Sequence, residues 1–112
     1  TSWLNTPYKY GGNTKQGTDC SGFVQQVYSE VYGISLARSA ADIYSQCKKI
    51  SRTDLKEGDL VFFKINTPKV GHVGIYLTDE YFIHASTQKG VIISNLAETY
   101  YAKYFHSCGR MP

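Results

Sequence analysis

The stretch Thr18-Asp19-Cys20-Ser21-Gly22-Phe23 decides how this sequence is interpreted, because it marks the start of a helix. Downstream of Cys20, four apolar residues recur at the spacing of one helical stripe: Phe23, Val24, Val27 and Val31. Asp19 is a favourable N-cap and Gly33 a favourable stop, so we predict a helix over residues 20–32. Cys20 lies on the same stripe, and its thiol should point towards whatever the helix packs on.

A cysteine in the first turn of a helix is a candidate nucleophile. The unpaired N–H groups and the helix dipole favour an anion there, which for Cys20 is the thiolate. We therefore expect the thiol pKa to fall well below its free value of about 8.5. Such a nucleophile needs a base, and the base needs a third group that holds its tautomer. We interpret the chain as a cysteine hydrolase.

Size and charge narrow the class of protein. The 112 residues suit one domain over residues 1–112, large enough to bury a core. Twelve Lys and Arg against nine Asp and Glu give a net charge of +3, and no basic run forms a patch. Nucleic-acid binding is therefore not expected, although an anionic polymer such as a bacterial wall would suit this balance.

The cysteines and the start of the chain bear on its compartment. Cys20, Cys47 and Cys108 form neither a disulfide framework nor a C-x-x-C zinc motif. In an exported protein Cys47 and Cys108 could pair and leave Cys20 free; we favour the alternative of two separate buried thiols. We interpret the abrupt opening at Thr1-Ser2-Trp3 as the cut edge of a longer precursor, so export remains open.

The pattern of the chain changes near its middle. Residues 8–17 read as a glycine-rich loop, a capping box at residues 39–42 opens a second helix to about Cys47, and residues 51–58 form a turn. Short β-rich segments follow at residues 59–64, 72–77, 81–85, 90–96 and 104–111. The predicted fold class is α+β, with N-terminal helices packed on one face of an antiparallel β-sheet.

Two histidines fall on adjacent predicted strands. If Thr78-Asp79-Glu80 is a three-residue connection, Gly74 pairs with His84. His72 and His84 then become diagonal neighbours on one face, about 7–8 Å apart at the backbone. A two-residue loop would put them on opposite faces. Gly74 favours the first register, because its missing side chain leaves room for an imidazole.

Each of these residues also has a purely structural interpretation. A cysteine on an apolar stripe is usually core, and a histidine on a half-buried strand is usually a satisfied structural residue. The combination of Cys20 with His72 and His84 favours catalysis, because thiol activation requires such a set. Metal ligation by the same three residues is the competing use, ranked lower because no acidic residue or second thiol completes the site. We assign no role to His106.

Four ordered motifs carry a resemblance to a known family. They are Asp19-Cys20-Ser21-Gly22-Phe23, Gly58-Asp59-Leu60-Val61-Phe62-Phe63, His72-Val73-Gly74-Ile75-Tyr76 and Phe82-Ile83-His84-Ala85-Ser86. Together with Gly11-Gly12 after Tyr8, they resemble the motifs of the NlpC-type cell-wall cysteine peptidases. The short length and residues 90–94 are most similar to the Spr-type murein endopeptidase lipoproteins. The resemblance implies a minimal papain-like fold, with Cys20 as nucleophile, His72 as base and His84 as the orienting third member, and no metal or cofactor.

The resemblance also implies residues that contact the substrate. Tyr8 would offer its hydroxyl near the oxyanion, beside the Cys20 N–H. Asp19 and Ser21, which flank the nucleophile, would contact the substrate peptide. The family often has Pro before its Arg-Ser pair, whereas Ala37 precedes Arg38 here, so Arg38 stays unassigned.

The implied reaction is amide hydrolysis in peptidoglycan stem peptides, next to the diamino acid, through a thioacyl intermediate. The bond is either γ-D-glutamyl–diaminopimelate or a D-Ala cross-link. We expect a monomer exported to the periplasm or cell envelope, with any lipid anchor to the membrane in a segment outside this chain. The alternatives are a non-catalytic peptidoglycan-binding module, a papain-like acyltransferase and a delivered antibacterial effector.

Overall fold

The computed structural model describes residues 3–65 and 67–111. Helix α1 spans Cys20–Tyr32, as predicted, and α2 spans Ala40–Gln46. The other elements are β1 (Asn13–Thr14), β2 (Gly17–Thr18), β3 (Lys48–Ile50), a 3-10 turn (Arg52–Asp54), β4 (Leu60–Phe63), β5 (His72–Tyr76), β6 (Tyr81–Ser86), β7 (Gly90–Asn95), α3 (Thr99–Tyr104) and β8 (Phe105–Arg110). The five predicted strands are confirmed as β4 to β8. The sequence did not predict β3, α3 or the small β1–β2 hairpin, and the predicted loop over residues 8–17 is wrong where that hairpin forms.

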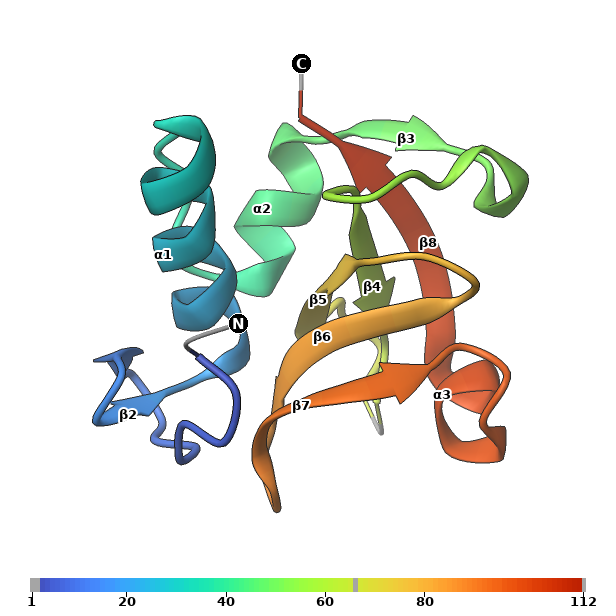
Figure 1. The fold of residues 1–112 in the computed structure, drawn as a ribbon. Coiled ribbons are helices and arrows are strands. Elements are labelled where there is room, and N and C mark those ends of the chain that lie inside the picture. The colour runs from blue at the N-terminus through green and yellow to red at the C-terminus, as the bar shows by residue number, and fades with distance from the viewer. Residues whose placement is uncertain (1–2, 66, 112) are drawn as a thin grey trace.

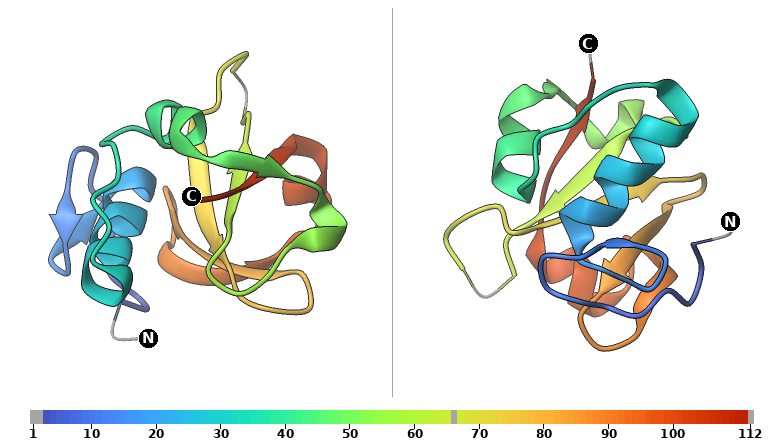
Figure 2. Two further views of the ribbon diagram at one scale, coloured as in Figure 1. Left: turned by 90° about the horizontal axis from the view of Figure 1, so that it is seen from above. Right: turned by 90° about the vertical axis from the view of Figure 1, so that its left-hand side faces the viewer.

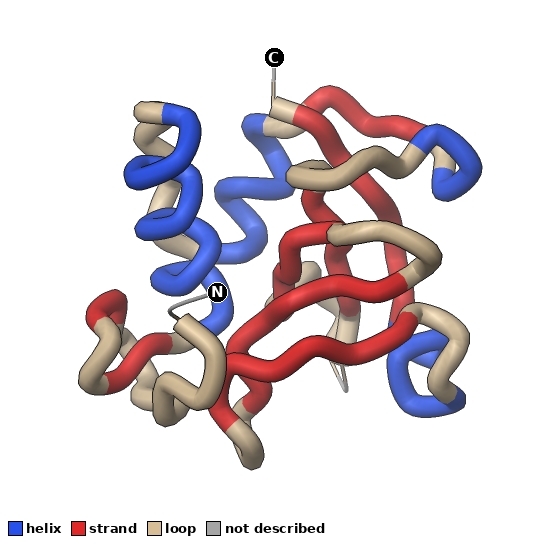
Figure 3. The backbone as a smooth tube through the Cα atoms, in the orientation of Figure 1, coloured by secondary structure: helices blue, strands red, loops and turns tan. Residues whose placement is uncertain are grey.

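Six strands form one antiparallel sheet in the order β3-β8-β4-β5-β6-β7 (Figures 1 and 3). The last strand, β8, therefore returns to lie between β3 and β4. Figure 2, seen from above, shows α1 and the β1–β2 hairpin on one side of the sheet and α3 on the other. The α+β architecture is the predicted one.

Apolar side chains cover both faces of the sheet. Towards α1 and α2 the sheet buries Leu60, Phe62, Val73, Ile75, Ile83, Ala85 and Val91. The opposite face buries Val61, Phe63, Tyr76, Phe82 and Cys108, and α3 adds Tyr101 and Tyr104 there. Packing on both faces explains why β4 is an uninterrupted apolar run. The predicted packing of the N-terminal helices on one face is confirmed. The cover that α3 gives to the opposite face was not predicted, because this six-residue helix is too short for its period to be recognised.

Helix α1 has the predicted caps. The Asp19 carboxylate accepts the Gly22 N–H at 2.7 Å, and Gly33 adopts a left-handed conformation with φ of 65°. The helix buries Phe23 and Tyr28, but Val31 is 65% exposed, so its predicted place in the core is wrong. Val31 lines an open hollow of about 270 Å³ whose lining also includes Ile75 and Tyr76 of β5.

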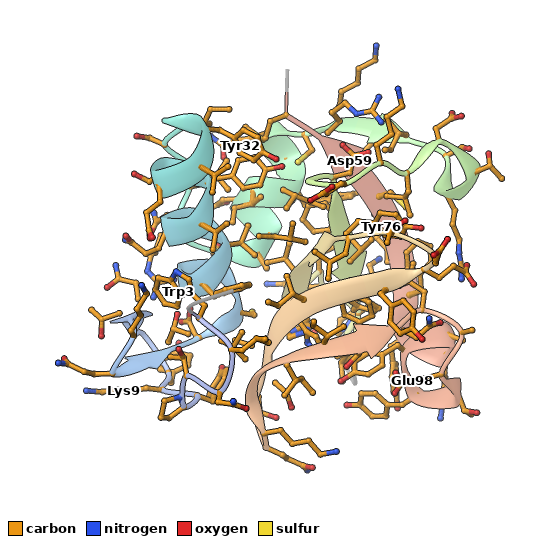
Figure 4. The ribbon with its side chains drawn as sticks, in the orientation of Figure 1. Trp3, Lys9, Tyr32, Asp59, Tyr76 and Glu98 are labelled. Carbon is orange, nitrogen blue, oxygen red and sulfur yellow. The ribbon has the colours of Figure 1, made fainter. Side chains whose placement is uncertain are left out.

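The N-terminal segment is tied to the sheet and to α1. Asn5 donates to the Val91 carbonyl at 2.9 Å, and Val91 donates to the Thr6 carbonyl at 2.9 Å. Trp3 lies beside the lower part of α1 (Figure 4), where its ring meets Phe23 edge-on at 5.6 Å. A β-bridge between Tyr8 and Thr18 completes the attachment. The segment therefore places Tyr8 next to the start of α1.

The Gly58-Asp59 motif has a structural role. Asp59 is 5% exposed and accepts a bidentate pair from Arg110, with Nε at 2.9 Å and Nη2 at 2.7 Å. The Tyr28 hydroxyl donates to the Gly58 carbonyl, and Gly58 has a φ of 92°. Figure 4 shows Asp59 at the end of the sheet near β3. The motif joins α1, β4 and β8.

Candidate active site

Cys20 occupies the first residue of α1 and is 8% exposed. Its Sγ lies 3.6 Å from the carbonyl oxygen of Gly71, just before β5. Burial raises the pKa of the Cys20 thiol and outweighs hydrogen bonds from the backbone N–H groups of Val73 and Ser21, which lower it. The expectation of a depressed thiol pKa is therefore wrong for this state, because the helix N-terminus acts on a sulfur that is almost removed from water.

The β5–β6 hairpin brings the two histidines together. Ile75 pairs with Ile83, and Leu77 donates to the Tyr81 carbonyl, which is the predicted three-residue register. His72 Nε2 lies 2.8 Å from His84 Nδ1. A Cβ atom on Gly74 would lie 3.1 Å from the Cβ of His84, so the predicted need for a glycine there is confirmed.

The cysteine and the histidines approach from opposite faces of the sheet. Cys20 belongs to the core cluster between the helices and the sheet, whereas the His72 ring contacts Phe63 at 5.7 Å on the other face. They meet because His72 is the first residue of β5, where the sheet ends. Both line a hollow of about 220 Å³, which we call the histidine hollow; its lining is Tyr8, Cys20, Ile65, Thr67, Gly71, His72, His84, Ser86, Thr87, Tyr100 and Tyr101.

Both imidazoles are neutral at pH 7. Burial lowers the pKa of His72 to about 4. Burial, with the charge that His72 would carry, lowers the pKa of His84 to about 2. The resting site therefore holds a neutral thiol beside a neutral imidazole rather than a thiolate–imidazolium pair.

Ser94 is a site residue that the sequence analysis missed. Its Oγ lies 2.9 Å from His84 Nε2, and it is 5% exposed. Tyr101 lies beside the same histidine, with its ring centroid 5.1 Å from that of His84. A second three-residue connection pairs Ser86 with Gly90, and this register makes Ser94 a diagonal neighbour of His84. The register of a three-residue connection, which was applied to residues 72–86, predicts this position of Ser94 when it is applied to the next hairpin.

Asp19, Ser21 and Arg38 form a polar cluster on the other side of Cys20. Arg38 Nη1 lies 3.1 Å from Asp19 Oδ1 and 3.0 Å from Ser21 Oγ, and Arg38 Nη2 lies 3.2 Å from Asp19 Oδ2. Burial alone would raise the pKa of Asp19, but Arg38 and the N–H groups of Gly22 and Gly11 lower it. Asp19 is thus an ionised N-cap that also holds Arg38, the residue left unassigned from sequence.

The cluster faces a second hollow, of about 400 Å³, which we call the arginine hollow. It is lined by Tyr8, Tyr10, Gly11, Asp19, Cys20, Ser21, Arg38, Ser39, Ala40, Val70 and Gly71. Cys20 and Tyr8 line both hollows. The nucleophile candidate therefore lies in the middle of a groove, with space on each side of it.

Tyr8 stands at the junction of the two hollows. Burial raises the pKa of Tyr8, and the nearby Cys20 raises it further. Its hydroxyl therefore stays protonated at neutral pH and is available as a hydrogen-bond donor beside the cysteine. The backbone of Lys9 donates to the Thr18 carbonyl at 2.9 Å, which holds Tyr8 in this position.

The other candidates lie apart from the groove. Cys47 and Cys108 are both free, and they belong to the core clusters on opposite faces of the sheet, so the alternative in which they pair is wrong. The exposed His106 contacts Tyr44.

In the part of the chain that the structure describes, no three His, Cys, Asp or Glu side chains form a group that could hold a metal ion. No helix over residues 3–65 and 67–111 has the length and hydropathy of a membrane span.

The chain is similar to proteins of one family over most of its length. The model of the NlpC/P60 family matches residues 5–110. The chain is 47% identical over 109 residues to a probable endopeptidase NlpC homolog of Haemophilus influenzae, covering 97% of this chain and 57% of that protein. It is 43% identical over 109 residues to the murein DD-endopeptidase MepS/murein LD-carboxypeptidase of Escherichia coli K12, with the same coverage.

A solved structure gives the same picture of the fold. The crystal structure of the NlpC/p60 domain of the peptidoglycan hydrolase SagA superposes with a TM-score of 0.83 at 30% identity, over 97% of this chain and 90% of that one. The chain spans little more than half the length of the two curated relatives, 57% in each case. The similarity to them therefore concerns only the matched part of each relative.

Proposed function

The chain belongs to the NlpC/P60 family, and on this premise we propose that it is a cysteine endopeptidase that hydrolyses amide bonds in peptidoglycan stem peptides. The observation that carries the proposal is the arrangement of Cys20, His72 and His84 in the middle of a groove. Nucleophile, base and orienting group are the parts that thiol catalysis needs. A groove that continues on both sides of Cys20 suits a bond inside a chain rather than at its end.

We assign the first chemical step to Cys20 and His72. His72 Nε2 is hydrogen-bonded to His84, so Nδ1 is the nitrogen of His72 that remains to accept the thiol proton. As the substrate carbonyl excludes water, the proton moves to His72 and the sulfur attacks the carbonyl carbon. The oxyanion forms beside the Cys20 N–H and the Tyr8 hydroxyl. Losing one such donor typically costs about 2.7–4 kcal/mol of transition-state stabilisation.

His72 then completes the cycle. The imidazolium donates its Nδ1 proton to the leaving amine, and the C–N bond breaks to give a thioacyl enzyme. Water, deprotonated by the neutral His72, hydrolyses the thioester and returns the proton to the Cys20 sulfur. His84 accepts the Nε2–H of His72 throughout and holds the ring in place.

Arg38, Asp19 and Ser21 are proposed to bind the peptide on the arginine-hollow side. The Arg38 side chain is 41% exposed, so part of its guanidinium remains open to a ligand. Stem peptides carry carboxylates, which a guanidinium binds in a bidentate fashion. Asp19 supplies the complementary negative charge for an amino group.

We further propose the bond and the place of action. MepS is named for DD-endopeptidase and LD-carboxypeptidase activities, so a D-Ala cross-link next to the diamino acid is our first choice, ahead of the γ-D-glutamyl bond. Such a substrate places the protein in the cell envelope, where it would act as a monomer. An attached lipid would be carried by a segment outside these 112 residues.

A digest of purified peptidoglycan tests the proposal. The wild type and Cys20→Ala are incubated side by side, and the released fragments are identified by mass spectrometry. Fragments that appear only with the wild type support hydrolysis, and their masses identify the bond. No difference between the two proteins would reject hydrolysis; sedimentation with the same wall preparation would then test the peptidoglycan-binding alternative.

A further inference from the structure

Ser94 extends the hydrogen bond between the two histidines, although the proposed reaction gives it no part. Ser94 Oγ lies 2.9 Å from His84 Nε2, whereas His84 Nδ1 faces His72. We propose that Ser94 is a positioning residue that sets the tautomer of His84 and, through it, the tautomer of His72. This inference rests on the proposed function, because His72 needs that tautomer only as a base.

The His84 ring has little freedom to choose other partners. It packs against Phe82 at 4.6 Å and meets the edge of Tyr101 at 5.1 Å. Gly74 lies directly behind it, and the residue is 1% exposed. The ring therefore keeps Nδ1 towards His72 and Nε2 towards Ser94.

The order of protons along these groups follows from the need for a free base. A neutral imidazole has one N–H and one acceptor nitrogen. His72 can take the Cys20 proton at Nδ1 only when its own proton is on Nε2. That N–H donates to His84 Nδ1, so the proton of His84 lies on Nε2 and requires an acceptor. Ser94 Oγ is the acceptor at this position.

Removing the Ser94 hydroxyl should move the proton of each histidine to its other ring nitrogen. In Ser94→Ala the Nε2–H of His84 would be a buried donor with no acceptor, which is unfavourable. His84 avoids this by carrying its proton on Nδ1, which then donates to His72 Nε2. His72 is left with its proton on Nδ1, facing Cys20, and cannot act as the base.

Long-range ¹⁵N–¹H NMR of the histidine side chains reads these tautomers directly. In the wild-type chain at pH 7, His72 and His84 should both give the pattern of an Nε2–H imidazole. Ser94→Ala should shift His84 towards the Nδ1–H pattern, and Ser94→Thr should keep the wild-type pattern. The matched control is Ser107→Ala, because the buried Ser107 hydroxyl on β8 has no hydrogen-bond partner among the described residues.

Kinetics on a stem peptide give the second readout. Ser94→Ala should lower kcat about tenfold to a hundredfold with little change in KM, and Ser94→Thr should restore most of it. An Nδ1–H pattern for His84 in the wild type would overturn the inference, as would wild-type tautomers and kcat in Ser94→Ala. If Ser94→Ala does not fold, the wild-type and Ser94→Thr spectra still test the inference, because they show which nitrogen of His84 carries the proton. The NMR result does not depend on turnover, so it separates a failure of this inference from a failure of the proposed function.

Discussion

Lowering the pH should destabilise this domain through its two buried histidines. His72 and His84 are 8% and 1% exposed, and burial lowers the pKa values of the folded protein to about 4 and about 2. In the unfolded chain both titrate near pH 6.5. Below that pH the unfolded state binds more protons than the folded state, so the free energy of unfolding falls as the pH falls.

The size of the effect follows from the two pKa values of each histidine. The pKa of His72 is about 6.5 in the unfolded chain and about 4 in the folded protein. This difference lowers the free energy of unfolding by about 2 kcal/mol between pH 7.5 and pH 5. His84 adds a similar amount, because its folded pKa lies lower still. The sum of about 4 kcal/mol is a large part of the free energy of unfolding of a typical domain, which is roughly 5–15 kcal/mol. Asp19 contributes little in this window, because its carboxyl group is ionised in both states.

Urea unfolding followed by circular dichroism at pH 7.5, 6.5, 5.5 and 5.0 measures this loss. The wild type should lose about 4 kcal/mol from the highest to the lowest pH, and His84→Gln about half as much. His106→Gln is the comparison: the pKa of His106 is also lowered, by burial and by Lys64, but the residue is exposed, so its replacement should change the slope less than that of His84. An unfolding free energy that is the same at pH 7.5 and pH 5.0 would refute the reasoning, because it would mean that the native histidines accept protons freely.

Three further results are expected from the site. The rate of Cys20 alkylation by iodoacetamide, with Cys20→Ala as the blank, should rise with pH up to an apparent pKa above that of a free thiol. A fast rate near pH 7 that does not change with pH would instead indicate a thiolate–imidazolium pair. His72→Ala should lower kcat more than His84→Ala in steady-state assays, since in the proposed mechanism only His72 transfers the proton; the reverse order would exchange their roles. Arg38→Lys should raise KM for a stem peptide about tenfold with a smaller change in kcat, because lysine cannot make the bidentate contact, and an unchanged KM would remove Arg38 from the peptide site.

Local rules predicted the elements whose determinants lie close together in the sequence. Asp19 and Gly33 bracket α1 as expected, and the three-residue connection fixes the β5–β6 register. The same rule applied to the next hairpin would have led to Ser94. In contrast, α3 contains six residues and no capping side chain, so nothing local distinguishes it from a loop. Its position is set by aromatic contacts such as that of Tyr101 with Phe82, at 5.2 Å.

The pKa of Cys20 could not be predicted from its place at a helix start. A helix N-terminus stabilises a thiolate by about 1 kcal/mol when it is exposed, and this was the only term visible in the sequence. Burial of the sulfur depends on how α1 docks against Gly71 and the start of β5, and these residues are 51 positions away. Tertiary burial therefore reverses the sign that the local rule predicts.

The same docking explains why a neutral pair suits this site. Cys20 and His72 come from opposite faces of the sheet and meet only at the end of β5, where the groove is open to a substrate. Without a bound ligand, neither the Cys20 thiolate nor the His72 imidazolium is stabilised, so the free protein avoids two buried charges. In the proposed reaction, the negative charge passes from sulfur to an oxyanion beside the Cys20 N–H and the Tyr8 hydroxyl. His84 then receives the hydrogen bond of the charged His72. The hydrogen-bonding groups then act on charges that exist only during the reaction, which is the condition for stabilising a transition state rather than the free enzyme.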